Sequence, residues 1–113
     1  MCDVVNFKQY GSRAALDRAF GERWRYIGRA NGHAQLDASP LANPFSVKQY
    51  GREGCIKRYR RWLWERMQSG DEAVLAALRA VDAKSVLVCW CEPLACHGDV
   101  VKAAAAWLQK QAV

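Results

Sequence analysis

Hydrophobic and polar positions along the chain follow two alternating patterns, which predict strands and helices in turn. Short apolar runs without helical spacing predict three strands, at residues 4–7, 24–27 and 86–90. Apolar residues that recur every three or four positions predict helices at residues 12–20, 53–68, about 71–81 and about 98–109. Residues 30–46 are rich in Gly, Asn, Pro, Ser and Asp, and because they follow neither pattern we expect a loop there.

The order of these elements predicts an α/β fold. Strands that alternate with helices usually form a mostly parallel sheet with both faces covered. The run at residues 86–90 is apolar throughout, which is typical of a central strand buried on both faces. A chain of 113 residues has room for one hydrophobic core. We therefore expect a single domain over residues 1–113, a small Rossmann-like domain with a short, mostly parallel sheet flanked by helices.

The composition favours anionic partners and a reducing compartment. The net charge of +6 and the pI near 9.3 are typical of chains that bind nucleotides, nucleic acid or phosphorylated metabolites. The chain has no apolar run near the length of a membrane span, and it opens without the basic and apolar segments of a secretory signal. Its five cysteines lack the spacing of a disulfide framework, so we expect thiols, a cytoplasmic location and no membrane partner.

Polar residues at the carboxyl ends of the predicted strands mark the expected site. Ligands of open parallel sheets bind beyond these ends. This rule selects Asn6, Gly28, Arg29 and the turn after Trp90. Arg29 could hold a phosphate or carboxylate in a bidentate fork, or it could form a surface ion pair.

Two segments beside these strand ends leave alternatives open. Gly28 indicates either a close backbone approach or a turn. The sequence Asn43-Pro44-Phe45, in the predicted loop, would place an amide and an aromatic ring beside the pocket, or it would form a turn with Phe45 in the core.

The segment from Cys89 to Asp99 holds the densest set of reactive side chains. Cys89 and Cys91 are two residues apart, so they share one face of a strand. Cys96 and His97 come directly before the last helix, whose unpaired amides and positive dipole would lower the pKa of a thiol at Cys96. Asp99, in the first turn, could cap that helix, orient His97 or act as an acid or base.

Three interpretations of this cluster remain open. In the first, Cys96 is a nucleophile assisted by His97 or Asp99. In the second, a zinc ion is held by ligands drawn from Cys91, Cys96, His97 and His33. In the third the cluster is structural: Cys89 fills the core, Asp99 caps the helix, and His97 is an exposed turn residue.

The helix at residues 53–68 has a cationic face opposite its apolar one. Four cations form this face: Lys57, Arg58, Arg60 and Arg61. Trp64 lies at its margin. A row of cations with an exposed aromatic suits phosphate contacts and base stacking, and the alternative is a solvated helix face on which a neighbour partly covers Trp64.

Several motifs resemble a known family when they are taken together. They are Val4-Val5-Asn6, Tyr26-Ile27-Gly28-Arg29, Leu41-Ala42-Asn43-Pro44-Phe45, Tyr59 with Trp62-Leu63, Cys89-Trp90-Cys91 and Cys96-His97-Gly98-Asp99. In this order they resemble a bacterial and phage family catalogued as domain of unknown function four-three-two-six. The resemblance implies a compact α/β domain with signature positions at Asn6, Arg29, Asn43, Cys91, Cys96, His97 and Asp99. It implies no particular reaction.

The leading functional hypothesis is a site that processes a nucleotide, a nucleoside or the end of a nucleic acid. Arg29 would hold the anionic group. The other expected ligand-binding residues are Asn6, Gly28, Asn43 and Cys91, and the expected catalytic residues are Cys96, His97 and Asp99. The alternative is a non-catalytic nucleic-acid-binding module that uses the basic helix, with or without a structural zinc. A third hypothesis is a phage protein that binds a host protein through Trp64 and the basic face.

Overall fold

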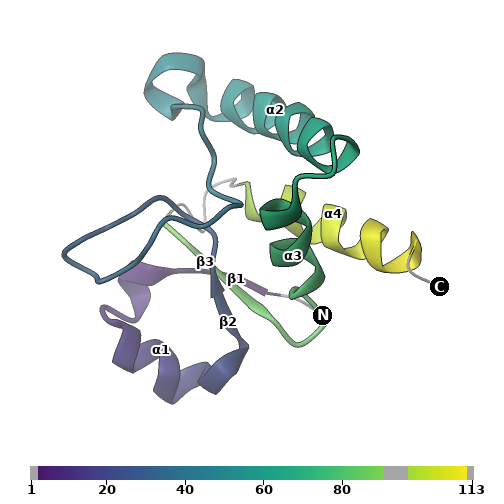
Figure 1. The fold of residues 1–113 in the computed structure, drawn as a ribbon. Helices are drawn as coiled ribbons and strands as arrows, with labels where there is room; N and C mark the ends of the chain where they lie inside the picture. The colour runs from purple at the N-terminus through teal and green to yellow at the C-terminus, as the bar shows by residue number, and fades with distance from the viewer. Residues whose placement is uncertain (1–2, 91–96, 112–113) are drawn as a thin grey trace.

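A computed structural model of the chain describes residues 3–90 and 97–111. At its centre three parallel strands form a sheet in the order β1-β3-β2 (Figure 1). The strands are β1 (Asp3–Asn6), β2 (Trp24–Tyr26) and β3 (Val86–Cys89). β3 pairs with both neighbours, and all four of its residues are buried. The prediction of a fully buried central strand in a small parallel α/β sheet is therefore confirmed.

The two faces of the sheet are covered by different parts of the chain. Leu87 and Cys89 of β3 pack into one core cluster together with residues of the later helices, whereas Val88 packs into a second cluster with Phe7 and Leu16. Figure 1 shows the same division, with α1 on one side of the sheet and α2, α3 and α4 on the other. Alternating side chains of one strand thus join two separate layers.

The first helix, α1 (Arg13–Phe20), begins and ends where the sequence predicts. The Ser12 hydroxyl accepts a hydrogen bond from the amide of Ala15 at 3.1 Å, which satisfies one of the unpaired amides at a helix start. Gly21 ends the helix with a positive φ of 61°, a conformation that glycine adopts without strain.

The longest helix, α2 (Val47–Gln68), begins six residues before the predicted start at residue 53. Ser46 caps it, and Gly51 interrupts it with φ 73° and ψ 167°. The apolar stripe becomes regular only after this interruption, which is why the prediction began there. The helix buries one side chain per turn, namely Cys55, Tyr59, Leu63 and Met67.

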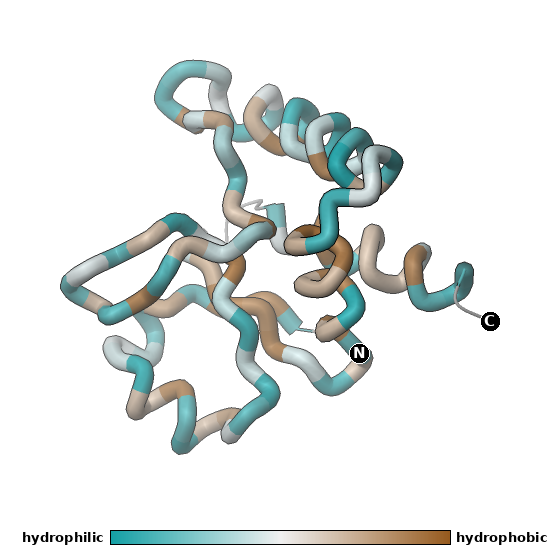
Figure 2. Tube along the Cα trace, viewed as in Figure 1, coloured by the Kyte–Doolittle hydropathy of each residue, from teal (hydrophilic) through white to brown (hydrophobic). Residues whose placement is uncertain are grey.

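Two shorter helices complete the layer. They are α3 (Glu72–Arg79), which Asp71 caps, and α4 (Gly98–Gln111). Figure 2 shows hydrophobic stretches gathered in the strands and in α3, whereas α2 alternates between hydrophilic and hydrophobic residues. The apolar spacing of the last helix predicts Trp107 on its core side, and this prediction is wrong, because the side chain is 40% exposed. None of the helices within the described residues is long and apolar enough to cross a membrane.

Candidate functional site

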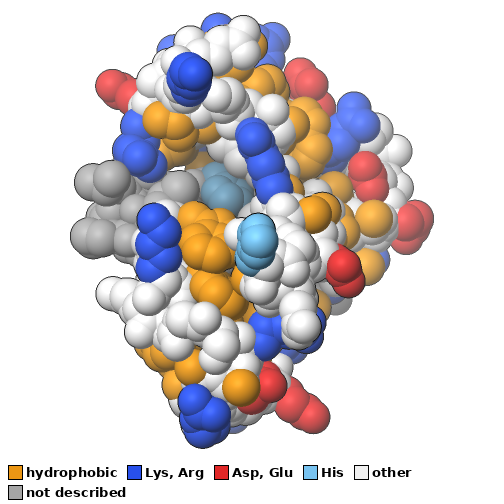
Figure 3. All heavy atoms as spheres, turned by 90° about the vertical axis from the view of Figure 1, so that its left-hand side faces the viewer, with side chains coloured by type: hydrophobic (Ala, Val, Ile, Leu, Met, Phe, Trp, Pro, Cys, Tyr) orange, Lys and Arg blue, Asp and Glu red, His pale blue; other side chains and the backbone are white. Residues whose placement is uncertain are grey.

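The carboxyl ends of β2 and β3 open onto a pocket of about 400 Å³. Four parts of the chain line it. They are the last residue of β2 with the segment after it (residues 26–31), the segment that leads into α2 together with its first residue (residues 43–47), residues 52–56 of α2, and the group Cys89, Trp90 and His97. Figure 3 looks onto a face of the molecule that is hollowed near its middle, with Lys and Arg side chains around the hollow. The site lies where ligands of parallel sheets bind.

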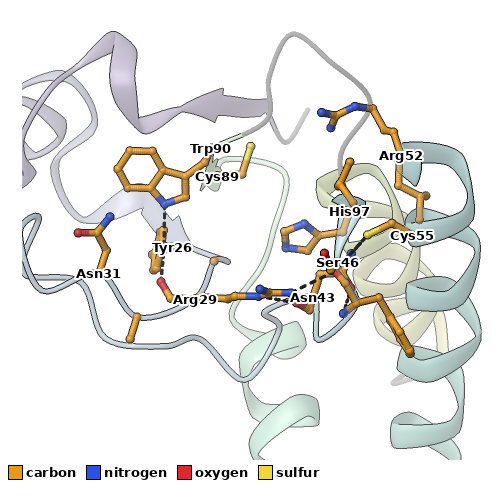
Figure 4. A pocket seen from close by; sticks show the side chains of 15 residues that line it. Tyr26, Arg29, Asn31, Asn43, Ser46, Arg52, Cys55, Cys89, Trp90 and His97 are labelled. Atoms are coloured by element: carbon orange, nitrogen blue, oxygen red, sulfur yellow. Dashed lines mark hydrogen bonds between the residues drawn. The ribbon is translucent and has the colours of Figure 1, made fainter. Parts of the chain in front are cut away.

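An aromatic wall forms one side of this pocket. The indole Nε1 of Trp90 donates a hydrogen bond to the Tyr26 hydroxyl at 2.8 Å, and this hydroxyl donates to the carbonyl of Arg29 at 2.5 Å (Figure 4). Burial raises the pKa of Tyr26, although the hydrogen bond from Trp90 acts in the opposite direction. Tyr26 therefore stays a neutral hydroxyl that can donate, and the wall is fixed by its own hydrogen bonds.

Gly28 is required by the close approach of the Tyr26 ring. A Cβ atom built on Gly28 would lie 2.5 Å from the Tyr26 hydroxyl oxygen and 2.6 Å from the ring carbon that carries it. Of the two alternatives that the sequence leaves for Gly28, the structure therefore shows the close approach, and its neighbour is the aromatic ring of the pocket wall.

Arg29 braces the loop on the opposite side of the pocket. Its Nε donates to the carbonyl of Asn43 at 3.0 Å, and its Nη2 donates to the carbonyl of Phe45 at 3.1 Å. These two donors form the side fork of the guanidinium, so the loop occupies the edge that was expected to clamp an anion. Carbonyl groups carry no net charge, and Arg29 thus keeps its positive charge beside the pocket.

Asn43 and Cys55 complete this brace. The Asn43 side chain accepts from the amide of Phe45 at 2.9 Å and donates to the sulfur of Cys55 at 3.0 Å. The Cys55 thiol in turn donates to the carbonyl of Phe45 at 3.2 Å. Residues 43–45 thus form a turn, and the side chains of Asn43 and Phe45 both line the pocket. Phe45 also packs against the core, so each of the two alternatives for this segment is partly correct.

His97 lies at the inner end of the pocket and is 8% exposed. Its Nε2 lies 2.7 Å from the carbonyl of Ile27, and because a carbonyl only accepts, Nε2 carries the proton. The edge of the imidazole meets the Tyr59 ring, with 4.9 Å between the ring centroids. The interpretation of His97 as an exposed turn residue is therefore wrong.

The described lining of the pocket contains positively charged side chains but no negatively charged ones. Arg29 and Arg52 line it, and none of the lining residues within the described part of the chain is an aspartate or a glutamate. Figure 4 shows Arg52 reaching from α2 over His97 on the same side as Cys89. Both guanidinium groups bring positive charge to the pocket, and positive charge attracts an anionic group.

The comparison with known families agrees with the motif resemblance. A family described as "Domain of unknown function (DUF4326)" matches residues 12–107. The chain belongs to this family. All four parts of the chain that line the pocket fall inside the matched range, so the pocket belongs to the DUF4326 domain itself. No curated protein and no solved structure matches the chain.

Several predicted site residues lie outside the pocket of this DUF4326 domain. Asn6 accepts from the amide of Lys8 at 2.9 Å and donates to the carbonyl of Trp90 at 3.1 Å, so it supports the aromatic wall from behind. His33 lines a separate, shallow recess on the other side of Trp90. Asp99 is exposed and lines a hollow between α2 and α4, hereafter the α2–α4 hollow, so the structure does not bring it to Arg29.

The predicted cysteine site is only partly described. Cys91 and Cys96 lie outside the described residues, and the proposals for these two thiols stay predictions. Cys55 and Cys89 are both buried. Among residues 3–90 and 97–111, no group of three or more His, Cys, Asp or Glu side chains is placed to hold a metal ion.

The predicted basic face is exposed along α2, as its four cations all face solvent. The Arg58 guanidinium stacks over the Tyr50 ring, with 4.2 Å between its central carbon and the ring centroid. Arg61 forms an exposed ion pair with Glu65, with 3.6 Å between Nε and Oε1. Trp64 is 48% exposed, and Trp107 covers part of it through an edge-to-face contact at 5.2 Å.

Sequence reasoning did not assign Tyr26, Asn31, Arg52 or Cys55 to the pocket of the DUF4326 domain that they line. A signal existed for Arg52, which precedes Cys55 and Tyr59 by three and seven residues and so shares their inward stripe. A cation on an apolar stripe indicates a buried site. The hydrogen bond between Trp90 and Tyr26 was harder to predict from the sequence, because it forms only if β2 and β3 are neighbours in the sheet.

Proposed function

We propose that the pocket binds a nucleotide, or the nucleotide at the end of a nucleic acid, and that it does so in the cytoplasm. The observation that carries this proposal is the pairing of two arginines with an aromatic wall in one cavity of about 400 Å³. Cavities of roughly 300–1,000 Å³ hold ligands of this size. Other anions would use the arginines but leave the aromatic wall without a partner.

The phosphate would lie at the arginine side. Arg52 and the part of the Arg29 guanidinium that does not brace the loop supply charge-assisted donors, which are stronger than neutral ones. The base would lie along Trp90 and Tyr26, since aromatic side chains stack on bases of any sequence. The amide of Asn31, whose oxygen accepts from the amide of Ala34 at 3.1 Å, keeps its NH₂ group for the base or sugar.

For a processing reaction, we propose Cys96 as the nucleophile and His97 as its base. Imidazole takes up and releases a proton near neutral pH, and the contact of Nε2 with the carbonyl of Ile27 fixes the orientation of the His97 ring. Asp99 has no part in this step, because it lines the α2–α4 hollow. Cys96→Ser should abolish any turnover while leaving nucleotide binding in place.

Calorimetric titration of the chain with a nucleoside 5′-monophosphate, the parent nucleoside and inorganic phosphate tests the binding proposal. We expect the monophosphate to bind more tightly than either part alone, and its affinity should fall as salt screens the arginines. Equal binding of phosphate and monophosphate would show that the aromatic wall contributes nothing, and it would contradict the proposal.

Nucleic-acid binding through the basic face is the second candidate, because Lys57, Arg58, Arg60 and Arg61 are all exposed on α2. A Lys57→Glu/Arg61→Glu variant should weaken binding to single-stranded DNA and lower its salt slope by about one unit per lost phosphate contact. An unchanged affinity and slope would exclude this face. A structural zinc at the cysteine cluster is part of this second candidate function, and elemental analysis of the purified chain for zinc tests it.

A further inference from the structure

The α2–α4 hollow is a second cavity, and the proposed function does not use it. It has a volume of about 460 Å³ and lies between two helices that are in contact. Its walls are mostly apolar, with Leu63, Met67 and Val100 toward the core and Trp64 and Trp107 toward solvent. The hollow therefore has the composition of an interface rather than that of a polar ligand site.

The two tryptophans are the most exposed large aromatic side chains of the described residues, at 48% for Trp64 and 40% for Trp107. They meet edge to face at 5.2 Å, so together they form one aromatic surface. Tryptophan is enriched among the residues that dominate the binding energy of protein interfaces. Leaving two of them half in water on one surface costs solvation free energy that a covering partner would recover.

The rim of the hollow carries one charge of each sign. Arg60 lies on the α2 side and Asp99 on the α4 side. Within the described residues, the salt bridge between Arg61 and Glu65 is the one ion pair, and neither Arg60 nor Asp99 takes part in it. A rim with a cation on one side and an anion on the other is complementary to a copy of itself.

The directions of α2 and α4 allow the same face of a second copy to pack against them. Figure 1 shows α2 and α4 running in the same direction across the molecule. On each helix the charged residue precedes the tryptophan, because Arg60 comes before Trp64 and Asp99 comes before Trp107. A two-fold axis along the hollow would place α2 of one copy over α4 of the other. Trp64 would then meet Trp107 twice in the same interface. Arg60 lies four residues before Trp64 and Asp99 eight before Trp107, so the Arg60 side chain would extend along the interface by roughly one helical turn, about 5.4 Å, to reach Asp99 of the other copy.

We propose that two copies of this chain associate face to face through the α2–α4 hollow. The tryptophans provide the apolar centre, and the reciprocal pairs of Arg60 with Asp99 set the register. The occupant is a second copy rather than an unrelated helix because the charges on the rim are self-complementary. The chain as a whole carries a net charge of +6, so the opposite charges at this face also offset the general repulsion between two copies.

Sedimentation equilibrium of the full chain tests the association directly. We expect a concentration-dependent dimer, and Trp64→Ala should weaken it by roughly thirtyfold or more, the effect of truncating a central interface tryptophan. Circular dichroism establishes that the variant is folded, and Trp107→Ala serves as the second variant should the first fail to fold. A wild-type chain that stays monomeric at its highest soluble concentration would overturn the proposal.

Charge reversal separates this interface from any other. Arg60→Asp and Asp99→Arg should each weaken the dimer by about tenfold or more, because like charges then face one another twice. An equimolar mixture of the two variants should dimerise like the wild type, since both ion pairs are restored between unlike chains. Arg61→Asp, on the same helix and with the same change in charge, should leave association unchanged. A dimer that survives each single reversal, or a mixture that stays monomeric, would overturn the proposed face.

Discussion

The pocket at the sheet edge and the α2–α4 hollow have similar volumes but opposite construction. In the pocket, Tyr26, Arg29, Asn43 and Cys55 are already held by hydrogen bonds to one another and to the backbone. In the hollow, two tryptophans are half exposed and the rim charges form no ion pair within the described residues. A cavity whose polar side chains are already braced suits a small ligand, whereas a half-exposed apolar surface suits a large one.

Residues of α2 line both cavities, so side chains of one helix can be compared directly. Tyr59 is fully buried beneath the pocket, where its hydroxyl donates to the carbonyl of Leu41 at 2.7 Å. Trp64 lies five residues further along the same helix and is half exposed. One helix therefore stabilises the fold through one of its aromatic residues and presents another to solvent.

The largest expected effect concerns these two aromatic residues. Tyr59→Ala should lower the free energy of unfolding by roughly 3–5 kcal/mol, as truncation of other buried aromatics does. Trp64→Ala should lower it by less than about 1 kcal/mol, because the side chain keeps much of its contact with water in the fold. Urea unfolding at low protein concentration measures both. Equal losses would remove the distinction between a structural and an interaction aromatic.

The next effect concerns the aromatic wall. Gly28→Ala should cost about 1–3 kcal/mol of stability, the usual range for overpacking, because the new methyl group collides with the Tyr26 ring. It should also break the hydrogen bond from Trp90 to Tyr26, which a change in tryptophan fluorescence reports. Gly32→Ala is the matched control, since a Cβ there meets no atom within 4 Å. Identical behaviour of the two variants would show that the wall is not tightly fitted.

A smaller effect is expected at the loop brace. Cys55→Ala leaves the carbonyl of Phe45 without its thiol donor and the Asn43 amide without its sulfur acceptor. We expect a loss of about 1–2 kcal/mol, the lower part of the range for buried polar groups that lose a partner. Cys55→Ser keeps both partners, so thermal unfolding should show a smaller loss. A serine variant no more stable than the alanine variant would mean that the thiol only fills space.

Local signals predicted much of the fold. Ser12 and Asp71 cap their helices through atoms three residues away, and the apolar run of β3 identifies a central strand without knowledge of its neighbours. The start of α2 was missed because Gly51 breaks the helix backbone while the residues on both sides remain helical.

The sequence predicted where in the fold the candidate site lies, but not which residues contact one another there. The rule for parallel sheets located Arg29 correctly at the pocket, yet the two carbonyls that its side fork binds lie 14 and 16 residues away in a loop without periodicity. His97 is buried because Ile27 and Tyr59, which are distant in sequence, enclose it. Such environments arise from tertiary packing, which the residues next to a position do not encode.

The most direct test of the pocket is a comparison of two arginines on one helix. Arg52 lines the pocket, and Arg61 is an exposed residue further along α2. In calorimetric titrations with a nucleoside 5′-monophosphate, Arg52→Gln should weaken binding about tenfold or more, the size of a lost charge-assisted hydrogen bond. The same variant should bind the parent nucleoside as the wild type does, and Arg61→Gln should change neither affinity. An Arg52→Gln variant that binds the monophosphate as tightly as the wild type would contradict the assignment of this pocket to a nucleotide.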